Sequence, residues 1–240
     1  MAWQFVERVL ELRLHIAIFD CDGTLWSGDA GRDFFYWEID RGMVCPEVAQ
    51  AMVERYRLYE AGEVSEEAIC GEMVTMNQGL EVQQLYAAGE QFYQEVVSSR
   101  VFPEMQQLTL RLAEAGCELW AVSSTNNWVV EAGVVRCGFA RGHVLAACVD
   151  SEDGKATNRL VRVPTDELKA VAIREVIGRP VDGVFGNSVH DLAMLEMAAH
   201  PFCINPNPDL QAIARKKNWP IYWPPGGNSH RVEGYRGESL

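Results

Sequence analysis

The stretch His-Ile-Ala-Ile-Phe-Asp-Cys-Asp-Gly-Thr-Leu at residues 15–25 places two carboxylates directly after a run of apolar side chains. A near-continuous apolar run, as between residues 14 and 19, is typical of a strand buried on both faces of a parallel sheet. Asp20 and Asp22 then emerge at the carboxyl end of that strand, where open α/β sheets bind ligands. Two carboxylates this close repel each other, so the pair favours a bound cation or a shared proton. A polar turn with an Asp-Gly bend is the alternative explanation of the stretch alone.

Composition and charge indicate an ordinary soluble globular protein. The chain has 240 residues, of which 48% are hydrophobic and 23% are charged. This length suits one large domain, or a core domain that carries a smaller insertion. The 21 basic and 34 acidic residues give a formal net charge of −13. Such an acidic chain is unlike a protein that binds phosphate backbones, so we expect no nucleic-acid partner.

The cysteines and the N-terminal residues predict a cytoplasmic protein. Residues 1–14 mix charged and apolar side chains, so they lack the layout of a secretory signal. No segment approaches the ~18 uninterrupted apolar residues of a membrane span, so we expect no membrane partner. The seven cysteines show no CxxC pair and no zinc-finger spacing, which predicts reduced thiols. Cys21 lies between the two aspartates, and we interpret it as a small buried filler rather than a redox group.

Further apolar runs, each followed by a helical pattern, predict a parallel sheet. They lie at residues 118–122, 181–185 and 201–204. The alternation of strands with helices is typical of α/β proteins. Two other runs, at residues 144–149 and 159–163, flank an Asp-Gly turn at residues 153–154. This pattern predicts a β-hairpin at the edge of the sheet.

Residues 27–100 contain no convincing strand. Their apolar positions, such as Ile69 and Met73, recur at helical spacing. Ser65 is followed by two glutamates and suits a helix start, because its hydroxyl caps a free amide and the acids face the positive end of the helix dipole. We therefore expect a helical insertion after the first strand.

The predicted organisation is a discontinuous α/β core with an inserted helical cap. The core comprises residues 1–26 and 101–240, and the cap comprises residues 27–100. Residues 219–240 are rich in proline and glycine, so we expect them to form an irregular C-terminal tail.

Two loops after later strands present polar side chains toward the same edge of the sheet. Residues 123–127, Ser-Ser-Thr-Asn-Asn, lead into a helix whose first amides suit an anion, although a helix cap explains them as well. The loop from Gly186 to Asp191 presents the oxygens of Asn187 and Asp191, which hard cations such as Mg²⁺ prefer. Asp191 also suits a helix-start acid, and we interpret His190 as a surface or packing residue.

A lysine is expected to complete this group of side chains. Residues 164–169 open a helix, and Lys169 in its first turn aims an ammonium at the same edge, where it would neutralise phosphate oxygens. A solvated lysine, or Lys155 of the hairpin instead, are the alternatives. We prefer Lys169 because its helix precedes the strand that ends at Gly186.

Together these segments resemble the motifs of the haloacid dehalogenase superfamily of phosphohydrolases, and specifically its phosphoserine-phosphatase-like branch with a helical cap after the first motif. The matching residues are Asp20, Asp22 and Thr24 in motif one, Ser123 in motif two, Lys169 in motif three and residues 186–191 in motif four. The resemblance extends from residue 16 to about residue 219. It implies a Rossmann-like doubly wound parallel sheet with the cap inserted after the first strand.

The resemblance also implies a mechanism and its residues. Asp20 would attack phosphorus and form an aspartyl-phosphate, and Asp22 would protonate the leaving oxygen and then activate water. Ser123 and Lys169 would neutralise the phosphoryl oxygens together with Mg²⁺. The expected metal-binding residues are Asp20, Asp22 through its main-chain carbonyl, Asn187 and Asp191. The expected substrate-binding residues are Gly23, Asp29 and Ser124.

The sequence departs from the family pattern in two places. Most relatives have an aspartate where this chain has Asn187, so we expect weaker Mg²⁺ binding and a larger share for Asp191, directly or through water. Residues 60–99 contain no lysine or arginine, although phosphoserine phosphatases hold the substrate carboxylate with a cap arginine. Asp29 lies where those enzymes place the acid that holds the substrate amine. The missing arginine argues against phosphoserine and favours an uncharged or amine-bearing phosphomonoester.

The sequence therefore predicts a Mg²⁺-dependent hydrolase of a small phosphorylated metabolite. Two alternatives stay open: a phosphotransferase that uses the same aspartyl-phosphate, and a phosphate-binding regulatory protein with weakened catalysis. The oligomeric state is not predicted.

Overall fold

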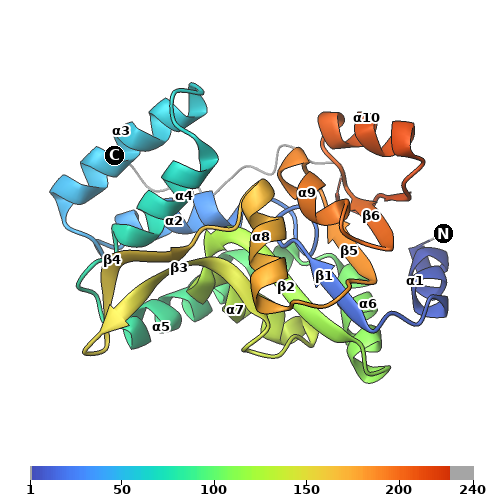
Figure 1. Ribbon diagram of the computed structural model, residues 1–240. Helices are drawn as coiled ribbons and strands as arrows, with labels where there is room; N and C mark the ends of the chain where they lie inside the picture. Colours follow the sequence, from blue (N-terminus) through green and yellow to red (C-terminus); the bar gives the residue numbers. More distant parts are fainter. Residues whose placement is uncertain (1, 228–240) are drawn as a thin grey trace.

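A seven-stranded sheet lies between two layers of helices in the computed structural model, which describes residues 2–227 (Figure 1). The strands are β1 (Ile16–Phe19), β2 (Glu118–Asn126), β3 (Val144–Glu152), β4 (Lys155–Arg162), β5 (Gly183–Gly186), β6 (His200–Ile204) and β7 (Ile221–Tyr222). Their order is β4-β3-β2-β1-β5-β6-β7, and all neighbours are parallel except β3 and β4. The predicted parallel α/β fold is confirmed, and its first strand lies in the middle of the sheet.

Helices cover both faces of the sheet because alternate strand residues point to opposite faces. On one face, Ile16 and Ile18 pack in a cluster with α8 (Glu167–Val176), α9 (Leu192–Leu195) and α10 (Pro208–Lys217). On the other face, Ala17 and Phe19 pack in a cluster with helices from the N-terminal and central parts of the chain. These helices are α1 (Ala2–Glu11), α5 (Val82–Phe92), α6 (Pro103–Glu114) and α7 (Asn127–Val134). The sheet is therefore doubly wound, as the sequence predicts.

Stacked aromatic rings support the strand ends at the centre of the sheet. Phe19 at the end of β1 stacks on Phe185 of β5, with ring centroids 4.2 Å apart, and Phe185 stacks on Phe202 of β6 at 4.7 Å. All three rings are buried. The packing of these three rings fixes the position of Phe19, and therefore of Asp20, the next residue.

The two edges of the sheet differ in how well the sequence predicts them. The β3–β4 hairpin forms as expected, and its turn residues Asp153 and Gly154 have φ of 50° and 80°, as a tight hairpin turn requires. At the other edge, β7 belongs to the tail predicted to be irregular from residue 219. It forms because Asn205 and Tyr222 pair across the open side of β6. The rest of that predicted tail, residues 228–240, lies outside the described residues.

The helices α2 (Ala30–Asp40), α3 (Pro46–Glu60) and α4 (Glu66–Thr75) gather above the β3–β4 hairpin (Figure 1). They share an apolar cluster of their own, which includes Phe35, Tyr56 and Ile69. Ser65 caps α4 as predicted, because its hydroxyl accepts a hydrogen bond from the N–H of Ala68 at 3.2 Å.

The predicted boundary of the cap at residue 100 stays a prediction. The α5 helix and the following π-helical turn at Tyr93–Val97 contribute side chains to the cluster beneath the sheet, beside α7. We propose that the cap consists of α2, α3 and α4, and that α5 belongs to the core.

Two other sequence expectations concern the chain as a whole. The seven cysteines are free, and Cys21 is fully buried, as expected for a small filler. Among the described residues, each helix is too short or too polar to pass through a bilayer.

A buried acid in α2 makes the stability of the protein depend on pH. Glu38 is fully buried, and within residues 2–227 neither carboxylate oxygen has a hydrogen-bond partner. Burial raises the pKa of Glu38 well above its usual value. The folded protein therefore holds the proton on Glu38 up to a higher pH than the unfolded chain, which ionises it above about pH 4.3. Its contribution to stability is present below that pH and is lost as the pH rises.

Glu38→Gln should remove this pH dependence, because glutamine has nearly the same shape and does not ionise. Between about pH 4.3 and the raised pKa of Glu38 in the folded protein, we expect the free energy of unfolding of the variant to increase relative to that of the wild type, by up to about 1.4 kcal/mol per pH unit. Urea denaturation at about pH 5, 6 and 7 measures the difference. Glu60→Gln, at the exposed end of α3, is the control and should follow the wild type. A curve for Glu38→Gln parallel to that of the wild type would contradict the prediction.

Candidate active site

The segments singled out in the sequence meet around one cavity of about 250 Å³ at the carboxyl ends of the central strands. Asp20 and Asp22 follow β1, Ser123 lies in β2, and Lys169 lies in the first turn of α8. Residues 187–190, which follow β5, form another part of the wall. The convergence occurs because parallel neighbours end at the same edge of the sheet.

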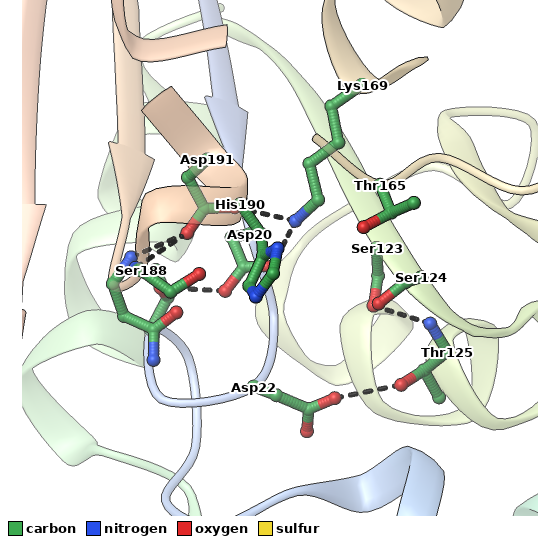
Figure 2. Close-up of polar contacts among 12 residues, drawn as sticks. Asp20, Asp22, Ser123, Ser124, Thr125, Thr165, Lys169, Ser188, His190 and Asp191 are labelled. Atoms are coloured by element: carbon green, nitrogen blue, oxygen red, sulfur yellow. Dashed lines mark hydrogen bonds and ion pairs between the residues drawn. The ribbon is translucent and has the colours of Figure 1, made fainter. Parts of the chain in front are cut away.

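Lys169 lies between two buried carboxylates (Figure 2). Its Nζ is 2.8 Å from Oδ1 of Asp20 and 2.6 Å from Oδ1 of Asp191. Burial lowers the pKa of Lys169, but the charges of Asp191 and Asp20 outweigh this effect and raise it overall. The lysine therefore keeps its charge, and the choice of Lys169 over Lys155 agrees with this placement.

Asp20 is held at both oxygens. While Oδ1 accepts from Lys169, Oδ2 accepts from the hydroxyl of Thr24 at 3.0 Å. Burial, and then the charge of Asp191, raise the pKa of Asp20 to about 7. Asp20 therefore takes up a proton more readily than a free carboxyl group does, in spite of its contact with Lys169.

Asp191 uses both oxygens within the protein. Oδ1 accepts from Lys169, and Oδ2 accepts from the main-chain N–H groups of Asn187 and Ser188 at 2.8 and 3.0 Å. The hydroxyl of Ser188 in turn caps the short 3-10 turn that contains Asp191. A role for Asp191 as a direct metal ligand stays a prediction, and these contacts favour a role in positioning the turn and Lys169.

Asp22 is oriented by three donors. Oδ1 accepts from the indole N–H of Trp26 at 2.7 Å and from the N–H of Ala30 at 2.8 Å. Oδ2 accepts from the hydroxyl of Thr125 at 2.9 Å (Figure 2). Burial raises the pKa of Asp22, although the donors lower it in part. Sequence reasoning assigned no role to Trp26 or Thr125, and only the i to i+4 spacing of Asp22 and Trp26 hinted at the first contact.

The remaining predicted residues take different places. Ser123 and Ser124 line the cavity. Asp29 lines it as well, and its carboxylate caps α2 by accepting from the N–H of Arg32 at 2.8 Å. Gly23 has φ of 73°, and a Cβ there would lie 1.9 Å from Nδ2 of Asn187. A side chain at Gly23 would therefore displace Asn187, which supports a role in shape rather than direct substrate contact.

The oxygen atoms at this edge fit a hard divalent cation. The predicted ligand residues Asp20, Asp22 and Asn187 all line the cavity, and a cation there would stabilise the charged form of Asp20, which burial disfavours. Within the described residues, no group of three or more His, Cys, Asp and Glu side chains is arranged to hold a metal.

Sequence reasoning missed a polar bridge from the cap. His190 contacts Glu66 of α4 through Nε2 at 2.8 Å and Asp166 through Nδ1 at 2.7 Å. The hydrogen bond with Glu66 is the main reason that the pKa of His190 is raised to about 9. His190 is therefore charged at neutral pH, and its interpretation as a surface or packing residue leaves out this contact.

Sequence reasoning also missed a guanidinium in the cavity wall. Arg32 of α2 lines the cavity, and its Nη2 is 2.9 Å from the fully buried carboxylate of Asp33. Asp33 also binds Arg100 at 2.6 Å. Arg32 is thus a basic residue at the cavity that lies outside residues 60–99, and its presence weakens the case against phosphoserine.

Comparisons with known proteins find relatives over most of the chain. The family model described as haloacid dehalogenase-like hydrolase matches residues 17–196. A putative hydrolase of Mycobacterium leprae is 28% identical over 226 residues, covering 85% of this chain and 71% of that protein. A phosphoserine phosphatase of Mycobacterium tuberculosis is 26% identical, covering 85% and 69%. A histidinol-phosphatase of Neisseria meningitidis is 22% identical, covering 86% and 97%.

Solved structures share the fold. A protein of unknown function from Bordetella pertussis Tohama I superposes with a TM-score of 0.76 at 23% identity, covering 86% of this chain and 96% of that one. A substrate-bound phosphoserine phosphatase superposes with a TM-score of 0.54 at 16% identity, covering 82% and 89%. These likenesses concern the arrangement of the sheet and helices.

Proposed function

Because the chain belongs to the haloacid dehalogenase-like hydrolase family, whose model matches residues 17–196, we propose that it is a Mg²⁺-dependent phosphomonoesterase with Asp20 as its nucleophile. The phosphatase class, with small phosphorylated substrates, follows from the family and from relatives that carry phosphatase names. The dependence on Mg²⁺ and the covalent intermediate at Asp20 go beyond this class and are our proposal.

The contact between Lys169 and Asp20 carries the proposal. The ammonium lies 2.8 Å from the carboxylate at the end of β1, inside the cavity that Ser123 also lines. A phosphoryl group that reaches Asp20 would therefore meet a fixed positive charge and a hydroxyl. Phosphoryl transfer depends mostly on such positioning and charge neutralisation.

The proposed reaction has two steps. An oxygen of Asp20 bonds to phosphorus while the bond from phosphorus to the alcohol oxygen breaks, and Asp22 donates a proton to that oxygen. Water then attacks the phosphorus and gives a proton to Asp22, which releases phosphate and restores Asp20. A raised pKa of Asp22 supports this exchange of one proton, and the donors Trp26 and Thr125 orient its carboxyl group.

Mg²⁺ would be held by Asp20, the main-chain carbonyl of Asp22 and Asn187. When bound, it would offset the negative charge of the phosphoryl oxygens. Within the chain itself, Asp191 fixes Lys169 and the 187–191 turn, so that the ammonium and the Asn187 side chain are placed before substrate arrives.

The side chains in the outer wall of the cavity limit which alcohol groups a substrate can carry. Asp29 and Arg32 provide opposite charges there, and Tyr56 and Tyr59 provide aromatic surface. A volume of about 250 Å³ suits a small metabolite. We propose a phosphomonoester that carries an amine close to Asp29. Phosphoserine and histidinol phosphate, the compounds in the names of two relatives, both contain one.

A panel of phosphomonoesters assayed with Mg²⁺ tests this function. The panel contains phosphoserine, histidinol phosphate, phosphoethanolamine and an amine-free sugar phosphate, and the readout is released phosphate. We expect hydrolysis of at least one amine-bearing member and none after treatment with a chelator. No turnover at any Mg²⁺ concentration would refute the proposal.

The variant Asn187→Asp measures how much the neutral amide weakens Mg²⁺ binding. A carboxylate adds a negative charge at the metal, so we expect the Mg²⁺ concentration for half-maximal activity to fall on the order of 10-fold. Asp40→Asn, at the exposed end of α2, is the control and should leave that concentration unchanged. An unchanged or higher Mg²⁺ requirement in Asn187→Asp would show that residue 187 does not bind the metal.

A further inference from the structure

The carboxylate of Glu66 joins the cap to the core at the cavity. It lies at the start of α4, its side chain is 14% exposed, and it forms part of the cavity wall. Oε1 accepts from the hydroxyl of Ser124 in β2 at 3.2 Å, and Oε2 is 2.8 Å from Nε2 of His190. One cap residue thus contacts both β2 and the turn that follows β5.

His190 extends this contact to α8. Its other ring nitrogen, Nδ1, is 2.7 Å from the carboxylate of Asp166, the residue directly before α8. The chain of contacts from Glu66 through His190 to Asp166 therefore ties α4 to the turn after β5 and to the helix that carries Lys169. Opening the cap away from the core would break the contact between Glu66 and His190.

The same turn holds the catalytic lysine in place. His190 immediately precedes Asp191, whose carboxylate accepts from Lys169 and from two main-chain N–H groups of the turn. A contact that holds His190 in one position therefore also restricts Asp191, the next residue of the same turn. The cap contact and the Lys169 contact are therefore made by neighbouring residues of one short segment.

A second ion pair, between the β3–β4 hairpin and the residue before α5, has a different character. Lys155 and Glu81 are 3.8 Å apart, and both side chains are more than half exposed. An exposed pair of this kind contributes little to stability. Glu66 is much more shielded from water, so its contact with His190 is the stronger candidate for holding the cap closed.

We propose that Glu66 and His190 are positioning residues: their contact holds the cap closed over the cavity and orders the turn that keeps Lys169 beside Asp20. The catalytic half of this inference rests on the proposed phosphatase function, whereas the closure of the cap does not. The two halves are therefore tested by separate measurements.

Hydrogen exchange tests closure without any need for turnover. In Glu66→Gln and in His190→Gln, we expect the main-chain amides of α4 to exchange about tenfold faster than in the wild type. Lys155→Gln, which removes the exposed ion pair, should leave α4 exchange unchanged. Unchanged α4 exchange in both Glu66→Gln and His190→Gln would overturn the proposal, whichever substrate the enzyme takes.

Kinetics test the positioning role on the best substrate of the panel. Each single variant should lose about tenfold in kcat/KM, and the double variant should lose no more than either one, because both replacements remove the same contact. Losses that multiply in the double variant would overturn the link between the two residues. Failure of the wild type to hydrolyse any phosphomonoester would instead contradict the proposed function, and the exchange result would still decide the closure.

Discussion

Asp20→Asn is expected to lose at least about 1,000-fold in kcat on any phosphomonoester that the wild type hydrolyses. The amide of asparagine is a poor nucleophile, and it cannot form the aspartyl-phosphate. The change is nearly isosteric: the amide oxygen can still accept from Lys169, while the amide NH2 group can donate to the hydroxyl of Thr24. Phosphate release by purified wild type and variant, at saturating Mg²⁺, measures the effect.

The intermediate itself gives a second readout. Acid quenching during turnover should trap one phosphoryl group on the wild type, located at Asp20 by peptide mass spectrometry, and none on Asp20→Asn. Asp40→Asn serves as the control at an exposed carboxylate and should keep both activity and labelling. Full activity in Asp20→Asn would overturn the nucleophile assignment, because none of the other groups around the cavity replaces a carboxylate in that position.

The sequence predicts the sheet well where burial is complete. Strands buried on both faces leave continuous apolar runs, which is why residues 16–19 and 200–204 are recognisable. The strand β7 has only two residues, and it forms by pairing with the open side of β6. No local sequence pattern therefore predicts it. The order of the strands is likewise a property of the packed sheet.

Some residues of the candidate site are likewise predictable from the sequence, whereas others depend on how distant parts of the chain pack. Asp20, Ser123 and Lys169 follow or precede strands and helices that the sequence reveals, and the rule that parallel strands end at one edge brings them together. The contact of Glu66 with His190 joins residues 124 positions apart, and it exists only because the cap docks on the core. Arg32 was missed for a similar reason, since its place in the cavity wall depends on how α2 lies over the strand ends.

Lys169→Met is expected to reduce both stability and activity, because it leaves two buried carboxylates without their shared cation. Breaking a buried ion pair by removing one partner costs about 3–5 kcal/mol. Without the ammonium, the pKa of Asp20 should rise further, so the variant should lose stability as the pH rises above about 4, where unfolded aspartate ionises. Urea denaturation at several pH values measures both effects.

Combining Lys169→Met with Asp191→Asn separates the structural role of the lysine from its catalytic role. The double variant keeps only one of the two buried carboxylates, and the amide nitrogen of asparagine contributes a donor near Asp20. We therefore expect it to regain at least about half of the lost stability. Its kcat should stay at least about 100-fold below that of the wild type, because no charge then neutralises the phosphoryl oxygens from this side. Recovery of activity along with stability would show that Lys169 acts only as a structural counter-ion. A single variant as stable as the wild type would instead show that Asp20 and Asp191 tolerate each other without it.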